Sequence, residues 1–479
     1  MLTTLLILVP LGAAVIVWAA PLPRELTAVL AVLAALAEVG LWIAALVEFD
    51  FADPALQLSA HHQWFEELGV SYQVGFYGFS LWLAGLSVVV SAVAIGYGAW
   101  AGRERARGYF GLMLFLTGSL VGVFASQDLL LFYVFFEAML IPLYVLVGVW
   151  GGPERVQATV TFVIYTMAGS LLMLASIIAF GVSQGTFSLQ SGGTSDNPWI
   201  FLGFLAAFAV KAPLFPFHGW LRAAYTQSSP EVAALLSGVV SKAAVFGLVM
   251  IVLPRFPEPV DHYRTLVLVL AVTGLVYGSL LAFRMPDVRG IVAYSSLAQM
   301  SLIVLGLFSA TSSADLGAGG AILQSVAHGL VSAAMFLLAG MVERRTGTGE
   351  LASLGGMAKG RPALATLIMV AGMFTLAVPG SANFAGEFLI LAGVYNQGWG
   401  YAVAGAAAIV FAAMYALRLI SGILHERRGG AVPEGARDLR PLELSIVVPL
   451  VACLLALSAW PAAVSDHSFP PVPQAGAAP

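Results

Sequence analysis

Five ionisable side chains stand out because each lies well inside a long apolar run. They are Glu137, Lys211, Lys242, His328 and Glu387. An ionisable group at the centre of a bilayer costs about 2.5 to 3.5 kcal/mol on insertion scales, so it marks a functional site by default. Carboxyl, amine and imidazole groups can all take up and release a proton. Their presence predicts proton movement through the interior of a membrane.

Glu137 and Lys211 are predicted to form a charge pair. Glu137 lies some nine residues into its apolar run, and Lys211 stands just before Pro213 and Pro216. Opposite charges keep each other ionised, so separating them changes how readily each holds a proton. The structural alternatives are a carboxylate that pins helices together and a lysine that reaches toward the membrane interface.

Lys242 and His328 are predicted to occupy the middle of the path. Small residues around Lys242 allow close helix packing and water, and an imidazole can pass protons either way near neutral pH. Glu387 follows Asn383 by four residues at a second helix break. A hydrogen-bonded core histidine is the structural alternative for His328, and a haem held by His328 and His218 is a remote one.

Three further residues are accessory candidates. His218 lies in an apolar segment, Asp128 precedes the helix that carries Glu137, and Gln299 stands in the tenth apolar segment. None is a catalytic residue in the sense of bond chemistry, and no metal ligand set is predicted.

Composition places the chain in a membrane. Of its 479 residues, 60% are apolar and 10% are charged, against about 45 to 50% and about 25% in soluble domains. The single cysteine, Cys453, can build neither a disulfide nor a cysteine-ligated iron–sulfur cluster. The net charge of −4, without a concentrated basic surface, argues against nucleic-acid binding.

The apolar segments predict an all-α polytopic fold with about fourteen transmembrane helices, because each segment is long enough to cross the hydrocarbon as a helix. The segments lie near residues 2–20, 25–48, 74–99, 109–126, 128–150, 158–182, 199–221, 229–253, 265–284, 288–309, 318–343, 362–395, 398–424 and 441–461.

Two of these segments, the seventh and the twelfth, contain helix breakers. Pro213 and Pro216 interrupt the seventh, and Pro379-Gly380 interrupts the twelfth. A proline removes a backbone donor and clashes with the preceding turn, so both helices should break. The breaks are five helices apart, which predicts an inverted repeat of helices 4–8 and 9–13.

This pattern gives a division into four parts: residues 1–108 with helices 1–3, residues 109–253 as the first five-helix repeat, residues 264–424 as the second, inverted repeat, and residues 441–479 as helix 14 with an external tail.

Arginines gather in alternate connections, around residues 103–107, 284–289, 344–361 and 427–440. The positive-inside rule makes that side cytoplasmic, so both termini are predicted outside. Residues 1–20 have no positive charge before the apolar run, which favours a retained first helix over a signal peptide.

Several motifs carry a family resemblance. The run from Asp128 to Pro142, DLLLFYVFFEAMLIP, closely resembles the fifth-helix motif of the M subunits (chain 4 type) of bacterial respiratory complex I. The stretches 215–221, 293–296, 328–330, 343–345 and 379–389 are similar to the rest of that family's pattern.

The resemblance implies a fourteen-helix channel made of two inverted units. Glu137 and Lys211 would serve the first half-channel, Lys242 and His328 the centre, and Glu387 the exit, where glutamate is typical of the M type. It implies proton translocation from cytoplasm to outside, driven by quinone reduction in other subunits of an NADH:quinone oxidoreductase in a bacterial plasma membrane.

The same resemblance implies no cofactor in this chain, because NADH, flavin, iron–sulfur clusters and quinone belong to partner subunits. The expected partners are the antiporter-like L and N subunit types, the small membrane subunits and the lipid bilayer.

Two alternatives remain open. Residues 228–238 lean toward a sodium/proton antiporter or a membrane-bound hydrogenase subunit, and Arg222-Ala-Ala-Tyr225 departs from the Pro-Asp-Ala-His that the family usually has there. Gln299, at a place where the family often has a histidine, keeps open a non-conducting scaffold.

Overall fold

The computed structural model describes residues 1–65, 69–310, 315–425 and 427–469. Within these ranges, twelve helical spans are long and apolar enough to cross a membrane. Shorter apolar helices are also present, and they form the two broken segments. The multi-pass helical architecture is therefore confirmed, whereas the predicted number of fourteen crossings stays a prediction.

The elements follow one another in a nearly uninterrupted series of helices. The first half contains α1 (Leu2–Ala19), α2 (Arg24–Glu48), β1 (Gln57–Phe65), β2 (Val70–Phe76), α3 (Gly78–Ala101), α4 (Ala106–Ala125), α5 (Leu129–Ala138), α6 (Leu140–Trp150), α7 (Arg155–Gln184), α8 (Pro198–Lys211), α9 (Leu221–Gln227), α10 (Pro230–Leu235), η2 (Leu236–Val240), α11 (Lys242–Gly247), η3 (Leu248–Val252) and α12 (Leu253–Arg255). The second half contains α13 (Pro257–Arg284), α14 (Val288–Ser309), α15 (Leu316–Thr346), η4 (Leu351–Ser353), α16 (Pro362–Thr375), α17 (Ala382–Tyr395), α18 (Trp399–Leu424), α19 (Pro441–Ala459) and α20 (Ala462–Ser465).

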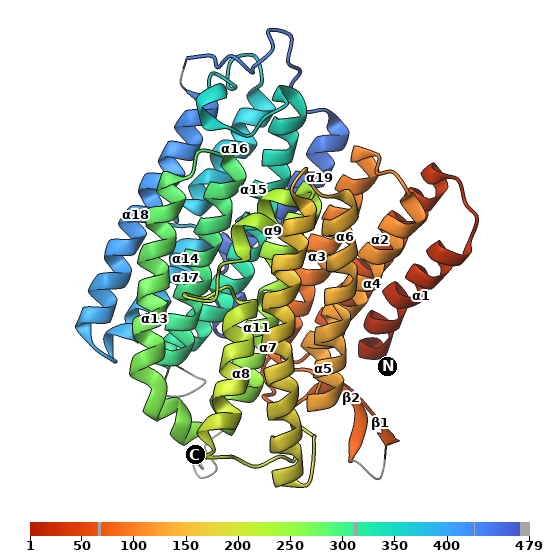
Figure 1. Ribbon diagram of the computed structural model, residues 1–479, viewed down its shortest axis with the longest axis vertical. Coiled ribbons are helices and arrows are strands. Elements are labelled where there is room, and N and C mark those ends of the chain that lie inside the picture. Colours follow the sequence, from red (N-terminus) through yellow and green to blue (C-terminus); the bar gives the residue numbers. More distant parts are fainter. Residues whose placement is uncertain (66–68, 311–314, 426, 470–479) are drawn as a thin grey trace.

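Both predicted helix breaks are present. α8 ends at Lys211 and α9 begins at Leu221, while α16 ends at Thr375 and α17 begins at Ala382. In Figure 1, α8 lies below α9 whereas α16 lies above α17, so the two broken segments run in opposite directions. This agrees with an inverted arrangement. The four domain boundaries stay predictions, and residues 470–479 of the expected tail lie outside the described residues.

The connection between α2 and α3 differs from the prediction. It forms an antiparallel hairpin of β1 and β2, in which Ala60 pairs with Val74 and His62 with Tyr72. The predicted third helix began near residue 74, but α3 begins at Gly78. Apolar residues of β2 extend the hydrophobic run past the true helix start, because an apolar run alone does not separate a strand from a helix end.

The helix that carries Glu137 is also interrupted. α5 ends at Ala138 and α6 begins at Leu140, where a single helix over 128–150 was expected. Pro142 has no N–H to donate to the carbonyl of Ala138, so the regular hydrogen-bond ladder is lost at this point. Glu137 therefore sits at the discontinuity.

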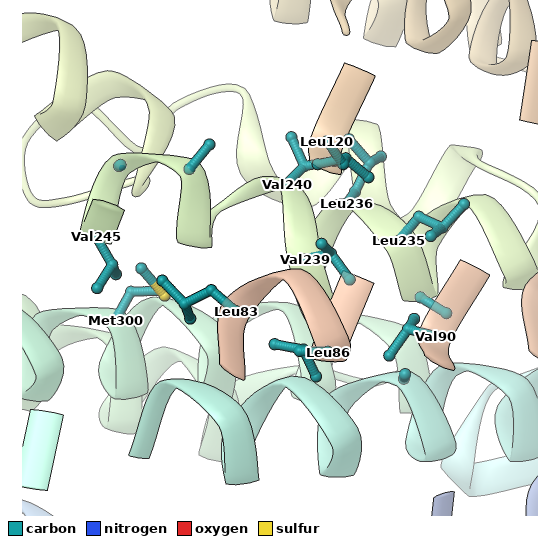
Figure 2. Packing of buried hydrophobic residues seen from close by; sticks show 14 of the residues in the cluster. Leu83, Leu86, Val90, Leu120, Leu235, Leu236, Val239, Val240, Val245 and Met300 are labelled. Carbon is teal, nitrogen blue, oxygen red and sulfur yellow. The ribbon is translucent and has the colours of Figure 1, made fainter. Parts of the chain in front are cut away.

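The core lies where α3, α4, η2 and α15 meet. Figure 2 shows Val239 and Val240 of η2 packed near Leu86 of α3 and Leu120 of α4, and all four side chains are buried. A Cβ on Gly329 of α15 would lie 2.6 Å from the carbonyl oxygen of Gly238. The missing side chains let η2 and α15 approach closely, as small residues do between membrane helices.

Burial separates central helices from peripheral ones. In the apolar, membrane-length stretch of α15, 100% of the residues are buried. In the corresponding stretch of α2 only 22% are buried, and its apolar side chains are exposed. A helix that is apolar all round belongs in the interior of a bundle or in lipid. α15, which carries His328, is thus the central helix.

Candidate proton path

Lys242 and His328 are in direct contact. Lys242 Nζ lies 2.9 Å from His328 Nδ1 and donates to the carbonyl oxygen of Ser237 at 2.8 Å. Both side chains are buried. When the lysine is charged, Nδ1 must accept, so the imidazole proton is on Nε2. The predicted central pair is therefore a hydrogen-bonded unit.

A π-helical turn places Lys242 for this contact. In η2 the Ser241 amide donates to the carbonyl of Leu236, five residues back. The widened turn leaves the Ser237 carbonyl available to the lysine ammonium. Single π turns inside α-helices recur at functional sites.

Three serines extend the unit on the other side of the imidazole. Ser296 Oγ lies 3.1 Å from His328 Nε2 and 2.6 Å from Ser237 Oγ. Ser237 Oγ in turn lies 2.5 Å from Ser332 Oγ. A hydroxyl both donates and accepts, so the chain from Lys242 to Ser332 can pass a proton by reorientation.

Glu387 belongs to a second buried group. Its Oε1 accepts from Gln299 Nε2 at 2.9 Å, and Gln299 Oε1 accepts from Gln324 Nε2 at 2.7 Å. Gln299 was predicted as an accessory residue, and the structure makes it the direct partner of Glu387. An amide cannot change its protonation here, so it fixes the carboxylate without competing for its proton.

A small cavity lies between the two groups. Its volume is about 20 Å³, and His328, Ser332, Gln299, Asn383 and Tyr415 are among its lining residues. Among the described residues, Asn383 Oδ1 and the Tyr415 hydroxyl have no hydrogen-bond partner. The volume is large enough for one water molecule, and the cavity wall is mostly apolar apart from such polar atoms.

The first predicted pair is looser. Lys211 is buried, and its Nζ lies 4.7 Å from the centre of the Phe136 ring. Among the described residues it forms no ion pair within hydrogen-bonding range. The half-buried Glu137 is close enough to act on Lys211 electrostatically. The structure thus brings the two charges near each other but leaves space between them.

The accessory residues have different surroundings. Asp128 caps α5, accepting from the amides of Leu130 and Leu131 at 2.9 and 3.1 Å, and from Ser71 at 3.2 Å. His218 stacks against Phe215 in the break between α8 and α9. Their roles on a proton path stay predictions, and the capping contacts explain why the structure needs a carboxylate at Asp128.

The donor set does not fit a metal centre. In the part of the chain that the structure describes, no three His, Cys, Asp or Glu residues are grouped to hold a metal ion. The contacts of His328 also bear on the alternative of a haem held by His328 and His218. Nδ1 of His328 faces Lys242 and Nε2 faces Ser296, so neither ring nitrogen is directed toward His218.

Several site residues escaped the sequence reasoning. Gln324 and Ser332 lie four residues before and after His328, so all three share one face of α15. That spacing was the available signal. Ser237 and Tyr415 gave no comparable signal, because a π turn and a distant helix bring them to the site.

Glu231, at the start of α10, is a buried carboxylate with a structural role. Its carboxylate takes two hydrogen bonds from Arg103, at 2.6 and 2.8 Å, and one from the Tyr109 hydroxyl at 2.5 Å. The ion pair keeps the pKa of Arg103, in the α3–α4 turn, above its ordinary value, although burial opposes this.

Comparison with known proteins identifies the family. Residues 126–413, more than half of the chain, match the family model described as NADH:quinone oxidoreductase/Mrp antiporter, transmembrane. A subunit M of NADH-quinone oxidoreductase from Rhodobacter capsulatus is 34% identical over 89% of this chain and 86% of its own length. The chain belongs to the subunit M family of NADH-quinone oxidoreductases.

Other members and solved structures agree with this family. Subunit M of Mycobacterium tuberculosis (strain H37Rv) is 34% identical over 97% of this chain and 92% of its own length. A chain of respiratory complex I from Thermus thermophilus with bound NADH superposes with a TM-score of 0.89 at 30% identity, covering 98% of both chains.

The Mrp complex from Dietzia sp. DQ12-45-1b contains a chain with a TM-score of 0.87 at 22% identity, covering 98% of this chain and 96% of that one. This likeness shows the shared fold alone. This chain thus has the same fold as a chain of the Mrp complex.

Proposed function

We propose that this chain carries protons across the membrane through Glu137, Lys211, Lys242, His328 and Glu387. The observation that carries the proposal is the buried hydrogen-bonded unit of Lys242, His328 and Ser296 beside a cavity lined by Gln299, the residue that donates to Glu387. Uncompensated charges are costly in this interior. A scaffold needs no such unit.

Protons enter from the basic side near Lys211 and reach Lys242. They pass to His328 and the serine hydroxyls, cross the cavity through water, and leave by Glu387. The gap between Glu137 and Lys211 supports a switching role, since a small movement that closes or widens it changes the charge that Lys211 can hold.

The driving energy comes from quinone reduction in partner subunits of an NADH:quinone oxidoreductase. NADH, flavin, iron–sulfur and quinone chemistry lies in those partners, among which antiporter-like L and N types and small membrane subunits adjoin this chain in a bacterial plasma membrane. The basic connections face the cytoplasm and both termini face outward, as the arginine distribution supports.

The test is a Glu387→Gln substitution in the assembled complex, with Glu434→Gln as control. Glu434 is an exposed loop carboxylate paired only with Arg428. Proton pumping into inverted membrane vesicles is measured at equal amounts of complex. Loss of pumping in Glu387→Gln alone is expected, because an amide accepts the Gln299 hydrogen bond but cannot release a proton. Full pumping in assembled Glu387→Gln complex would favour the scaffold reading.

A further inference from the structure

The break between α8 and α9 leaves a backbone carbonyl without its usual helical partner. The amide of Leu214, four residues after Val210, donates instead to the carbonyl of Ala209 at 2.8 Å. The carbonyl oxygen of Val210 accepts from Trp220 Nε1 at 3.0 Å. A buried carbonyl needs a partner, and here an indole from the other side of the break supplies it. Trp220 is therefore bound to the residue next to Lys211.

Trp220 contacts a second buried aromatic residue, Tyr225 of α9. Their rings meet edge to face with centroids 6.0 Å apart. The Tyr225 ring also meets Phe336 of α15 edge to face, at 5.7 Å. Trp220 and Tyr225 are 1% and 0% exposed. Aromatic pairs prefer this geometry, and the close packing around both rings means that they move together.

The hydroxyl of Tyr225 contacts the π turn that places Lys242. It donates to the carbonyl oxygen of Leu236 at 3.3 Å. The same carbonyl accepts from the Ser241 amide, also at 3.3 Å, and this bond closes the turn. The Tyr225 hydroxyl interacts as well with the side chain of Ser237, whose own carbonyl accepts from Lys242 Nζ. Tyr225 thus holds the residues that determine where the lysine ammonium lies.

Together these contacts connect the surroundings of the two lysines of the proposed path. At one end, Trp220 binds the backbone next to Lys211. At the other end, Tyr225 binds the turn next to Lys242. The prolines of the break remove backbone hydrogen bonds that would keep α8 and α9 in register. Side-chain contacts therefore carry the connection between the two helices.

We propose that Trp220 and Tyr225 form a bridge between the α8–α9 break and the π turn η2, and that this bridge positions Lys242. The inference rests on the proposed proton path and adds two residues that carry no proton themselves. A shift of the break moves the Tyr225 hydroxyl against η2, and this movement changes the contact between Lys242 and His328. A change at the first charge pair thus reaches the central unit through packing.

The test compares Tyr225→Phe with Tyr225→4-aminophenylalanine in the assembled complex. Phenylalanine keeps the ring but has no donor for the Leu236 carbonyl, whereas 4-aminophenylalanine has an N–H donor at nearly the same place. Tyr225→Phe should lower the initial rate of proton pumping about two- to tenfold, because one hydrogen bond contributes a factor of this size. The amino variant should recover most of the rate. Pumping is measured well below the melting temperature and at equal amounts of complex, so loss of folded subunit does not enter.

The matched control is Tyr144→Phe, since Tyr144 of α6 is 52% exposed; it should pump at the parent rate. Trp220→Phe tests the other end of the bridge, because phenylalanine lacks the indole donor to Val210. If the two residues act as one bridge, the double variant Trp220→Phe with Tyr225→Phe pumps about as fast as the slower single variant. Independent residues would multiply their losses.

Three results would overturn the proposal: parent-rate pumping in Tyr225→Phe, no recovery with 4-aminophenylalanine, or multiplied losses in the double variant. Should Tyr225→Phe not assemble, the assembled Trp220→Phe complex decides, with slowed pumping expected and parent-rate pumping overturning the bridge. Failure of the proton path itself is distinguishable. In that case Lys242→Ala pumps at the parent rate, whereas failure of the bridge alone leaves Lys242→Ala unable to pump.

Discussion

At the scale of single residues, the buried Lys242 has three hydrogen-bond partners that stabilise its charge. A hydrogen bond to a charged group contributes about 1.5 to 3 kcal/mol. The partners are the carbonyl of Ser237, the Ser241 hydroxyl and His328 Nδ1. Of the three, the imidazole is the base that takes up a proton near neutral pH. In the proposed path, His328 is therefore the residue on which transfer beyond Lys242 depends.

His328→Ala should lower the initial rate of proton pumping about tenfold or more, since each 1.36 kcal/mol added to the barrier slows a step tenfold. Ser296→Ala should lower it less, because the Lys242–His328 contact remains. The rate is followed by dye quenching in inverted vesicles containing equal amounts of complex.

Ser325→Ala is the matched control on α15, because Ser325 Oγ donates only to the backbone carbonyl of Ala321. It should pump at the parent rate. An unchanged rate in His328→Ala would show that protons bypass the imidazole.

At the scale of elements, the contact between η2 and α15 depends on two glycines. A Cβ on Gly238 would lie 2.9 Å from the carbonyl oxygen of Gly329, and the reverse distance is 2.6 Å. Both obstacles are backbone atoms, which cannot turn aside as a side chain can. Any added side chain must push η2 and α15 apart, and this movement also separates Lys242 from His328.

Gly329→Ala should destabilise the subunit by about 1 to 3 kcal/mol, as overpacking does, and should also lower pumping. Thermal melting of the purified complex reports the first effect. Gly12→Ala on α1 is the control, since a Cβ there meets no atom within 4 Å. A Gly329→Ala complex with parent melting and pumping would show that the close approach is dispensable.

The start of α16 depends on one carboxylate from another connection. Asp438 accepts from the amides of Ala363 and Leu364, both at 2.9 Å. These bonds and the one from the Leu439 amide hold its pKa below the ordinary value, against an opposing effect of burial. The stabilisation is thus present above the unfolded pKa and is lost as pH falls through the folded one.

Asp438→Asn should cost about 0.3 to 1 kcal/mol near neutral pH, because the amide keeps one acceptor oxygen but loses the negative charge that favours a helix start. The melting temperature of the subunit in detergent, compared with the parent, reports this cost. The difference should shrink below about pH 4, where the parent carboxylate begins to be protonated. A difference that does not change with pH would contradict the charge-based explanation.

Prediction from sequence succeeded for elements where a single residue type forces the backbone. Pro213 and Pro216 predict the first helix break, and Pro379 with Gly380 predicts the second. Prediction failed where the backbone conformation depends on contacts with other parts of the chain. The π turn in η2 has no distinctive composition, and the β1–β2 hairpin lies in an apolar run that continues into α3.

The sequence predicted which residues belong to the site better than it predicted which of them are in contact. An intramembrane charge is visible in the sequence because lipid excludes it. Whether Lys242 touches His328, or Glu137 stays apart from Lys211, depends on helix packing to within an ångström. Gln299 shows the limit most clearly, since only the structure reveals it as the partner of Glu387.

At the scale of the whole molecule, the buried groups lie on central helices and the lipid-facing helices surround them. α14 and α15 are almost entirely buried, and they carry Gln299, Ser296 and His328. Because these helices are closely packed, a conformational change at one end of them can reach the other end through contacting side chains. Their burial also separates the residues of the proposed path from lipid.

The most direct test of this account is Lys242→Ala in the assembled complex, with proton pumping and NADH:quinone reductase activity measured together. Lys359→Ala, an exposed loop lysine, is the control. The account predicts that both activities fall together in Lys242→Ala and stay at parent levels in the control. Assembled Lys242→Ala complex that pumps and reduces quinone at full rate would contradict it.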